Sequence, residues 1–72
     1  MKKYIFNKEL LLTERYKLKM TQKELAEQTG LERARIAQYE TRDYFPSSPG
    51  LYKLAKGMNL KMEDFIKAVN IK

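Results

Sequence analysis

The most informative segment of the chain is residues 21–41, TQKELAEQTGLERARIAQYET, which predicts two short helices joined by a tight turn. The first helix has a clear beginning, because Thr21 and Glu24 have the spacing of a capping box, in which each side chain binds the backbone amide of the other residue. Gly30 should end that helix, since glycine readily adopts the left-handed conformation common at helix ends. The second helix should follow over about residues 33–41.

These two helices have the layout of a helix-turn-helix. Two helices that meet at a steep angle need a small side chain where they touch, and Ala26 provides one next to the turn at Gly30. We expect four apolar residues to fill the corner between the helices: Leu25, Leu31, Ile36 and Tyr39. The second helix is then left with an exposed polar face, which can enter the major groove of B-DNA, about 12 Å wide.

The rest of the chain predicts three more helices, over residues 8–17, about 48–58 and about 62–69. Their starting signals are an N-cap at Asn7, Pro49 in a first turn, and acidic side chains in the first turn of the last helix. We expect Asn59 to close the second of these helices in left-handed geometry. Sustained alternation of apolar and polar residues is missing from the sequence, so strands are not expected.

The composition excludes several classes of function. A length of 72 residues leaves room for one core, so we interpret residues 1–72 as a single domain. The chain has no histidine, no cysteine and no glycine-rich phosphate loop, so we predict neither an enzyme nor a metal or cofactor site. Its longest aliphatic run is residues 10–12, too short for a membrane span, and we expect a cytoplasmic protein. The net charge of +6 favours a polyanionic partner.

Several segments together resemble the phage-repressor, or Xre-like, helix-turn-helix family. The segments in the helix-turn-helix are MTQKELA at residues 20–26, GL at 30–31 and IAQYE at 36–40. Later segments are similar to that family's fourth and fifth helices at the expected spacing: PS at residues 46–47, Leu51, KLAK at 53–56, MNL at 58–60 and EDF at 63–65. The resemblance covers about residues 11–65, which is most of the chain.

The resemblance implies a compact all-α domain of five helices, like that of lambda repressor, with a helix-turn-helix at its centre. Its function would be that of a sequence-specific regulator of transcription, a repressor in a prokaryote or its phage, bound to double-stranded DNA. A monomer reads too few base pairs for tight specificity, so we expect a homodimer on a palindromic operator. The serious alternative is a protein–protein adaptor or antitoxin-type module, for which the exposed side chains of the second helix would be dispensable.

The resemblance also implies roles for individual residues. Base edges would be contacted by Arg33, Ala34 and Gln38. Arginine can bind guanine and glutamine can bind adenine, each through two hydrogen bonds. Phosphates would be contacted by Gln22, Arg35, Thr41 and Arg42. Arg15 and Glu40 match a pair that forms a salt bridge between helices in this family.

Three positions depart from the family pattern. Glycine is common in the family where this chain has Lys19 and Arg42, so those turns must be built differently, and we expect Asp43 to take the left-handed conformation. Glu32 replaces the usual serine or threonine at the N-cap of the second helix. A carboxylate suits a helix N-terminus but repels phosphates, and it could instead accept a hydrogen bond from cytosine.

Two segments outside the helix-turn-helix leave alternatives open. Residues 1–7 form an apolar N-terminal arm that could pack on the domain, pair as a strand with a partner, or make a dimer contact. Residues 62–72 are predicted to be a dimerisation helix and tail, in which Ile66, Val69 and Ile71 form either the dimer contact or an internal one. In the loop 43–50, Tyr44 and Phe45 either cover the core or touch the DNA backbone, and we favour the former.

Overall fold

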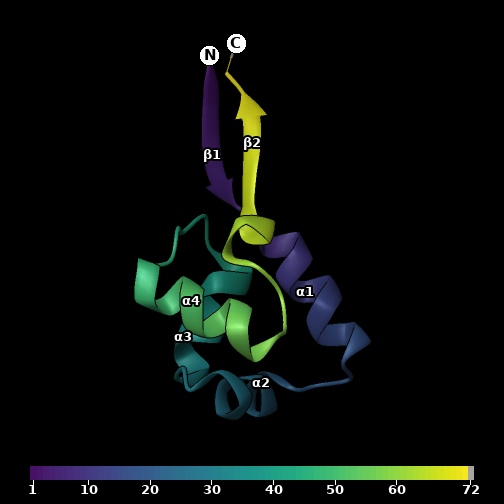
Figure 1. Cartoon of the computed structure of the whole chain (residues 1–72). Coiled ribbons are helices and arrows are strands. Elements are labelled where there is room, and N and C mark those ends of the chain that lie inside the picture. The colour runs from purple at the N-terminus through teal and green to yellow at the C-terminus, as the bar shows by residue number, and fades with distance from the viewer. Residues whose placement is uncertain (72) are drawn as a thin grey trace.

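The computed structural model describes residues 1–71, which form a helical body and a two-stranded arm projecting from it (Figure 1). The arm carries both described chain ends at its tip, far from α2 at the other end of the molecule. The elements, in chain order, are β1 (Lys2–Phe6), α1 (Lys8–Lys17), α2 (Gln22–Thr29), α3 (Arg33–Thr41), α4 (Ser48–Gly57), the short 3₁₀ helix η1 (Met62–Phe65) and β2 (Ile66–Asn70).

The helices α1 and α2 begin where the sequence predicts, because their predicted capping side chains are in place. The Asn7 side chain accepts a hydrogen bond from the Leu10 amide over 3.2 Å. The capping box of α2 is confirmed, with the Glu24 amide 3.1 Å from Thr21 Oγ1 and the Thr21 amide 2.9 Å from Glu24 Oε1. Gly30 ends α2 in left-handed geometry, at φ 76°.

The core lies where the four α-helices meet η1. Its fully buried side chains include Leu11, Leu25, Ile36, Tyr39, Leu54 and Phe65. Leu25, Ala26, Ile36 and Tyr39 are buried as predicted, and Leu31 packs partly buried against them. The base of the arm is anchored in this core by Phe6, whose ring stacks on that of Phe65 with centroids 5.6 Å apart.

The C-terminal segment corrects the prediction of a fifth helix and, with it, of an all-α fold. The helix expected over about residues 62–69 ends after the single turn η1, and the chain continues as β2. β2 pairs antiparallel with β1, with Tyr4 opposite Ala68 and Phe6 opposite Ile66. The N-terminal arm therefore pairs with its own chain, because it offers backbone partners to a segment containing β-branched Ile66 and Val69. Within the predicted dimerisation segment 62–72, residue 72 lies outside the described residues.

The turns after α1 and α3 are built differently from one another. Lys19 takes the left-handed conformation itself, at φ 56°, although it is not glycine. The chain leaves α3 in extended geometry at Arg42, and the expectation of a left-handed Asp43 is wrong. Instead, Asp43 is held by Lys8, whose Nζ lies 3.0 Å from its carboxylate. Asn59 is left-handed after α4, at φ 58°, as predicted.

Candidate nucleic-acid interface

The side of α3 that carries the predicted base contacts is open to solvent. Arg33, Ala34 and Arg35 in its first turn are exposed, and Gln38 one turn later is half-buried. The opposite side of the helix anchors it to the body through buried Ile36 and Tyr39. The helix is therefore fixed along one side and presents the other outward.

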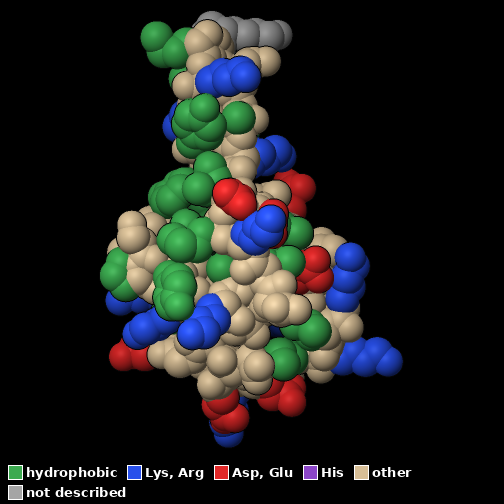
Figure 2. Space-filling model, viewed as in Figure 1, with side chains coloured by type: hydrophobic (Ala, Val, Ile, Leu, Met, Phe, Trp, Pro, Cys, Tyr) green, Lys and Arg blue, Asp and Glu red, His purple; other side chains and the backbone are tan. Residues whose placement is uncertain are grey.

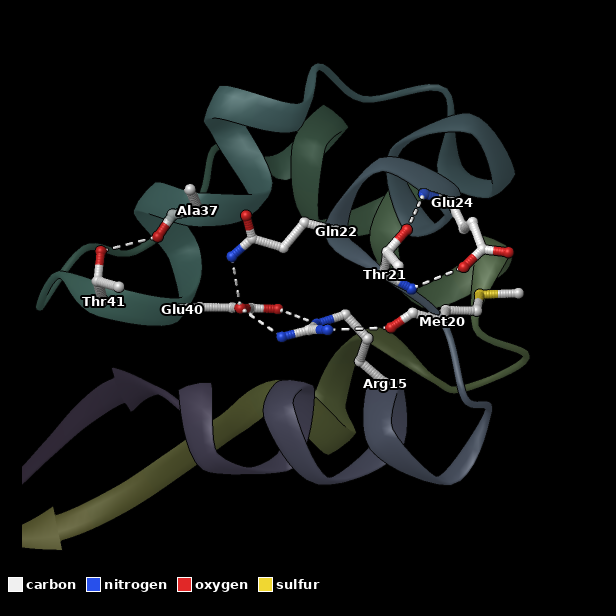
Figure 3. Close-up of polar contacts among 8 residues, drawn as sticks. All are labelled: Arg15, Met20, Thr21, Gln22, Glu24, Ala37, Glu40 and Thr41. Atoms are coloured by element: carbon white, nitrogen blue, oxygen red, sulfur yellow. Dashed lines mark hydrogen bonds and ion pairs between the residues drawn. The ribbon is translucent and has the colours of Figure 1, made fainter.

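A buried ion pair fixes α3 against α1. Arg15 Nε donates to Glu40 Oε2 over 2.6 Å, and Nη2 donates to Oε1 over 3.0 Å (Figure 3). The side chains are 11% and 3% exposed, so the pair is largely shielded from water. The hydrogen bond from Arg15 to the Glu40 carboxylate raises the pKa of Arg15 above its ordinary value. Arg15 Nη1 also donates to the Met20 carbonyl over 2.9 Å, which joins α1 to the segment leading into α2.

Gln22, the first residue of α2, is linked to this ion pair. Its Nε2 atom donates to Glu40 Oε1 over 3.0 Å (Figure 3). A primary amide carries two hydrogens, and Glu40 takes only one of them. The second can donate to another acceptor while the first keeps the side chain in place. The resemblance did not reveal this link between Gln22 and Glu40, and their separation in sequence offers no signal for it.

The predicted phosphate contacts Thr41 and Arg42 differ in whether their hydrogen-bond donors are free to reach a phosphate. Arg42 is exposed at the end of α3. Thr41 is exposed too, but its hydroxyl donates to the Ala37 carbonyl over 2.8 Å (Figure 3). The Thr41 hydroxyl hydrogen is therefore used within the helix, and donation to a phosphate requires the side chain to rotate.

Arg35 leans toward the loop that follows α3. Its Nη1 atom makes a long hydrogen bond of 3.5 Å to the Tyr44 hydroxyl. The Tyr44 ring stacks on Tyr39 at 5.8 Å between centroids, so it covers part of the core, yet Tyr44 remains 39% exposed. Burial raises the pKa of the Tyr39 hydroxyl above its ordinary value. Sequence reasoning missed the contact between Arg35 and Tyr44, which depends on how the loop returns to the helix.

The electrostatic balance of α3 is positive. Residues 33–42 hold three arginines and one acid, Glu40, and the buried ion pair with Arg15 compensates that acid. At the N-terminal end, Glu32 is exposed and its side chain caps no backbone amide of the helix. The carboxylate of the residue directly before Arg33 is therefore not used in capping α3.

Two further observations concern metal-binding groups and membrane-spanning helices among residues 1–71. Within this part of the chain, no group of three or more acidic, histidine or cysteine side chains is arranged to hold a metal ion. Among the same residues, none of the helices has the length and apolar character needed to span a membrane.

The packing of α2 on α3 through the turn at Gly30, with one face of α3 exposed, defines a helix-turn-helix. Residues 11–65 match the family model described as helix-turn-helix, so the chain belongs to the helix-turn-helix family of phage-repressor, or Xre-like, type. A similar protein from Archaeoglobus fulgidus is named an uncharacterized HTH-type transcriptional regulator. It is 44% identical over 50 residues, which cover 69% of this chain and 70% of the relative.

Proposed function

We propose that this protein regulates transcription as a repressor, by binding double-stranded DNA with α3 in the major groove. The observation that carries the proposal is the exposed first turn of α3, with Arg33 and Arg35, on a helix whose acid, Glu40, is paired internally. The family match and the name of the Archaeoglobus relative support the same function. The net charge of +6 adds the attraction to phosphate that such binding needs.

In this proposal the residues divide into two groups. Arg33, Ala34 and Gln38 contact base edges and so select the sequence. The contacts that fix the position of the domain on the DNA backbone come from Gln22, Arg35, Thr41 and Arg42. The link from Gln22 to Glu40 supports this division, because it ties a backbone contact to the ion pair that holds α3 in place.

We propose further that two copies bind a palindromic operator. One copy of α3 reaches only a few base pairs, and a two-fold pair doubles the sequence that is read. The half-sites would lie about one helical turn apart, roughly 34 Å. Within such a dimer, the two copies of α3 enter successive major grooves on one side of the duplex.

Selection of bound fragments from a random duplex library, with sequencing of the bound pool, tests the proposal. The expected outcome is an enriched inverted repeat, with a spacing that gives the distance between half-sites. A reporter gene with this repeat over its promoter should be expressed less when the protein is present. A pool without enrichment at low salt would overturn the proposal and favour the protein–protein adaptor.

A further inference from the structure

The arm is a two-stranded ribbon standing clear of the helical body (Figure 1). Ribbons of two strands are marginally stable in water, and three or more strands with an apolar face are usually needed. The strands carry exposed apolar side chains, with Tyr4 62% and Ile66 39% exposed. In the view of Figure 2, apolar and basic side chains mix over the arm and acidic ones lie on the body below it. The ribbon has the character of an incomplete sheet.

The hydrogen bonds at the two ends of the β1–β2 ribbon show which backbone groups of each strand point away from the other strand. The Ile71 amide donates to the Met1 carbonyl over 2.9 Å at the tip, and the Asn7 amide donates to the Phe65 carbonyl over 2.7 Å at the base. Hydrogen-bonded pairs alternate along an antiparallel ladder. With the observed register, the N–H and C=O groups of Ala68 therefore point away from β1, at the outer edge of β2.

The two outer edges of the ribbon are not equivalent. The edge of β1 has lysine at positions 2 and 3, whereas β2 has only Lys67. Lysines on an edge strand discourage pairing with another chain, and pairing two copies of β1 would gather twice as many of them. The loop between α3 and α4 also rises beside the base of β1 (Figure 1). Tyr44 and Phe45 of this loop line a hollow together with Tyr4. The edge of β2 is the less charged and more open of the two.

We propose that two copies of this protein join the outer edges of their β2 strands to form one four-stranded antiparallel sheet. The inference rests on the two-fold dimer of the proposed function and names its contact surface. Strands β1 and β2 lie outside the family match, which ends at residue 65, so the helix-turn-helix itself does not supply this surface.

The register of β2 fits a two-fold axis at Ala68. Ala68 of one copy then lies opposite Ala68 of the other copy, and the two residues exchange N–H and C=O hydrogen bonds. Lys67 of each copy lies opposite Val69 of the other, so no lysines face one another directly. Because Tyr4 is opposite Ala68 within each chain, one face of the sheet carries the row Tyr4, Ala68, Ala68, Tyr4. Because the alanine side chains at the two-fold axis are small, they leave room for the two Tyr4 rings to lie over the paired β2 strands.

A cysteine placed at position 68 tests the shared edge, because the chain has no cysteine of its own. Hydrogen-bonded antiparallel neighbours have Cα atoms about 5.5 Å apart, within the range that a disulfide spans. The matched control is Tyr4→Cys, since the two copies of position 4 would be three strand spacings, about 14 Å, apart. Tyr4 is well exposed, so random collisions would cross-link this variant readily.

Under mild oxidation without DNA, Ala68→Cys should form a covalent dimer at least about tenfold faster than Tyr4→Cys, because its thiols are held together. Equal rates, or faster cross-linking of Tyr4→Cys, would overturn the proposed edge. Reduction should return both variants to the sedimentation behaviour of the unmodified chain.

Proline at position 68 gives a second, non-covalent test. Ala68→Pro removes only the N–H that points away from β1, and an edge strand such as β2 tolerates proline at such a position. Ala68→Pro should raise the dimer dissociation constant by about tenfold or more, since two hydrogen bonds across the axis are lost. Tyr4→Pro, which removes the equivalent N–H on the other edge, should leave the dimer in place. A dimer unaffected by Ala68→Pro would contradict the proposal.

Duplex binding by the unmodified chain separates the two proposals. A chain that selects an inverted repeat but fails to cross-link through position 68 overturns the shared sheet and leaves the regulatory function standing. A chain that cross-links through position 68 but binds no duplex supports the sheet and overturns the function.

Discussion

Gln22 donates from Nε2 to Glu40 Oε1 over 3.0 Å, which connects the first residue of α2 to the end of α3. Arg15 donates to the same carboxylate from α1. One buried carboxylate therefore receives side chains from two other helices, and it sets the position of a predicted phosphate contact relative to the predicted reading helix. The Glu40 carboxylate therefore contributes both to the packing of the helices and to the position of Gln22.

Replacing Gln22 should weaken DNA binding without changing sequence preference. Gln22→Ala removes the amide hydrogen that is available for a phosphate, and hydrogen bonds to charged groups contribute about 1.5–3 kcal/mol. We expect roughly tenfold or greater weakening on selected and scrambled duplexes alike, measured by fluorescence anisotropy. Gln28→Ala, an exposed glutamine on the same helix, should bind as the unmodified chain does. A changed consensus in the Gln22→Ala pool would show that this residue reads bases.

Breaking the Arg15–Glu40 pair from one side should destabilise the fold more than removing both partners. Arg15→Met leaves a buried carboxylate without its cation, which typically costs about 3–5 kcal/mol. The double variant Arg15→Met, Glu40→Met removes both charges and should recover a large part of that loss. Urea denaturation of the two single variants and the double variant measures the coupling. Additive losses would mean that the pair does not interact as its 2.6 Å contact indicates.

Gly57 should not tolerate alanine, although alanine favours helices. A Cβ atom at position 57 would lie 2.6 Å from Thr29 Cγ2 and 2.9 Å from Thr29 Cα, so α4 would have to move away from α2. Overpacking of this kind costs about 1–3 kcal/mol, which exceeds the gain of up to about 1 kcal/mol in helix propensity. The free energy of unfolding should fall, while Lys56→Ala at the exposed neighbouring position should change it little. A more stable Gly57→Ala variant would refute the close approach of the two helices.

The capping box of α2 should give the fold a specific dependence on pH. Hydrogen bonds from Thr21 lower the pKa of Glu24 below its ordinary value. The stabilisation is therefore present above the ordinary carboxyl pKa, about 4.3, and is lost as the pH falls through the lower folded value. Glu24→Gln should lack this part of the acid-induced loss of stability. Thr21→Ala should cost about 1 kcal/mol at neutral pH, measured by thermal unfolding. Equal acid sensitivity of Glu24→Gln and the unmodified chain would refute the role of the carboxylate.

The sequence was most informative where local chemistry decides the structure. The bounds of α1 and α3 agree with the prediction, and α2 begins and ends at its predicted capping residues, because Asn7, Thr21 and Gly30 act within one turn of the helix end. Burial of Ile36 and Tyr39 also followed from the helix-turn-helix pattern, since the corner between two helices must be filled.

The sequence was least informative where a distant segment decides the structure. Glu63 and Asp64 predict a helix start, and a 3₁₀ turn forms there. Residues 66–70 then form a strand because they pair with β1. Nothing local to that segment reveals its partner at the other end of the chain. The same holds at Asp43, which pairs with Lys8 and does not take the left-handed conformation. The contact between Arg35 and Tyr44 depends in the same way on the path of a loop.

The central proposal is that α3 reads base edges through Arg33, and a comparison of two duplexes tests it most directly. Binding of the selected inverted repeat and of a scrambled duplex is measured for the unmodified chain, Arg33→Ala and Lys3→Ala, a variant that removes one positive charge from the arm. Arg33→Ala should lose about 1–3 kcal/mol on the selected duplex and relax selectivity at one base pair, whereas Lys3→Ala should keep its selectivity. Equal losses for Arg33→Ala on both duplexes would show that Arg33 contributes charge only, and would contradict the proposed reading of bases.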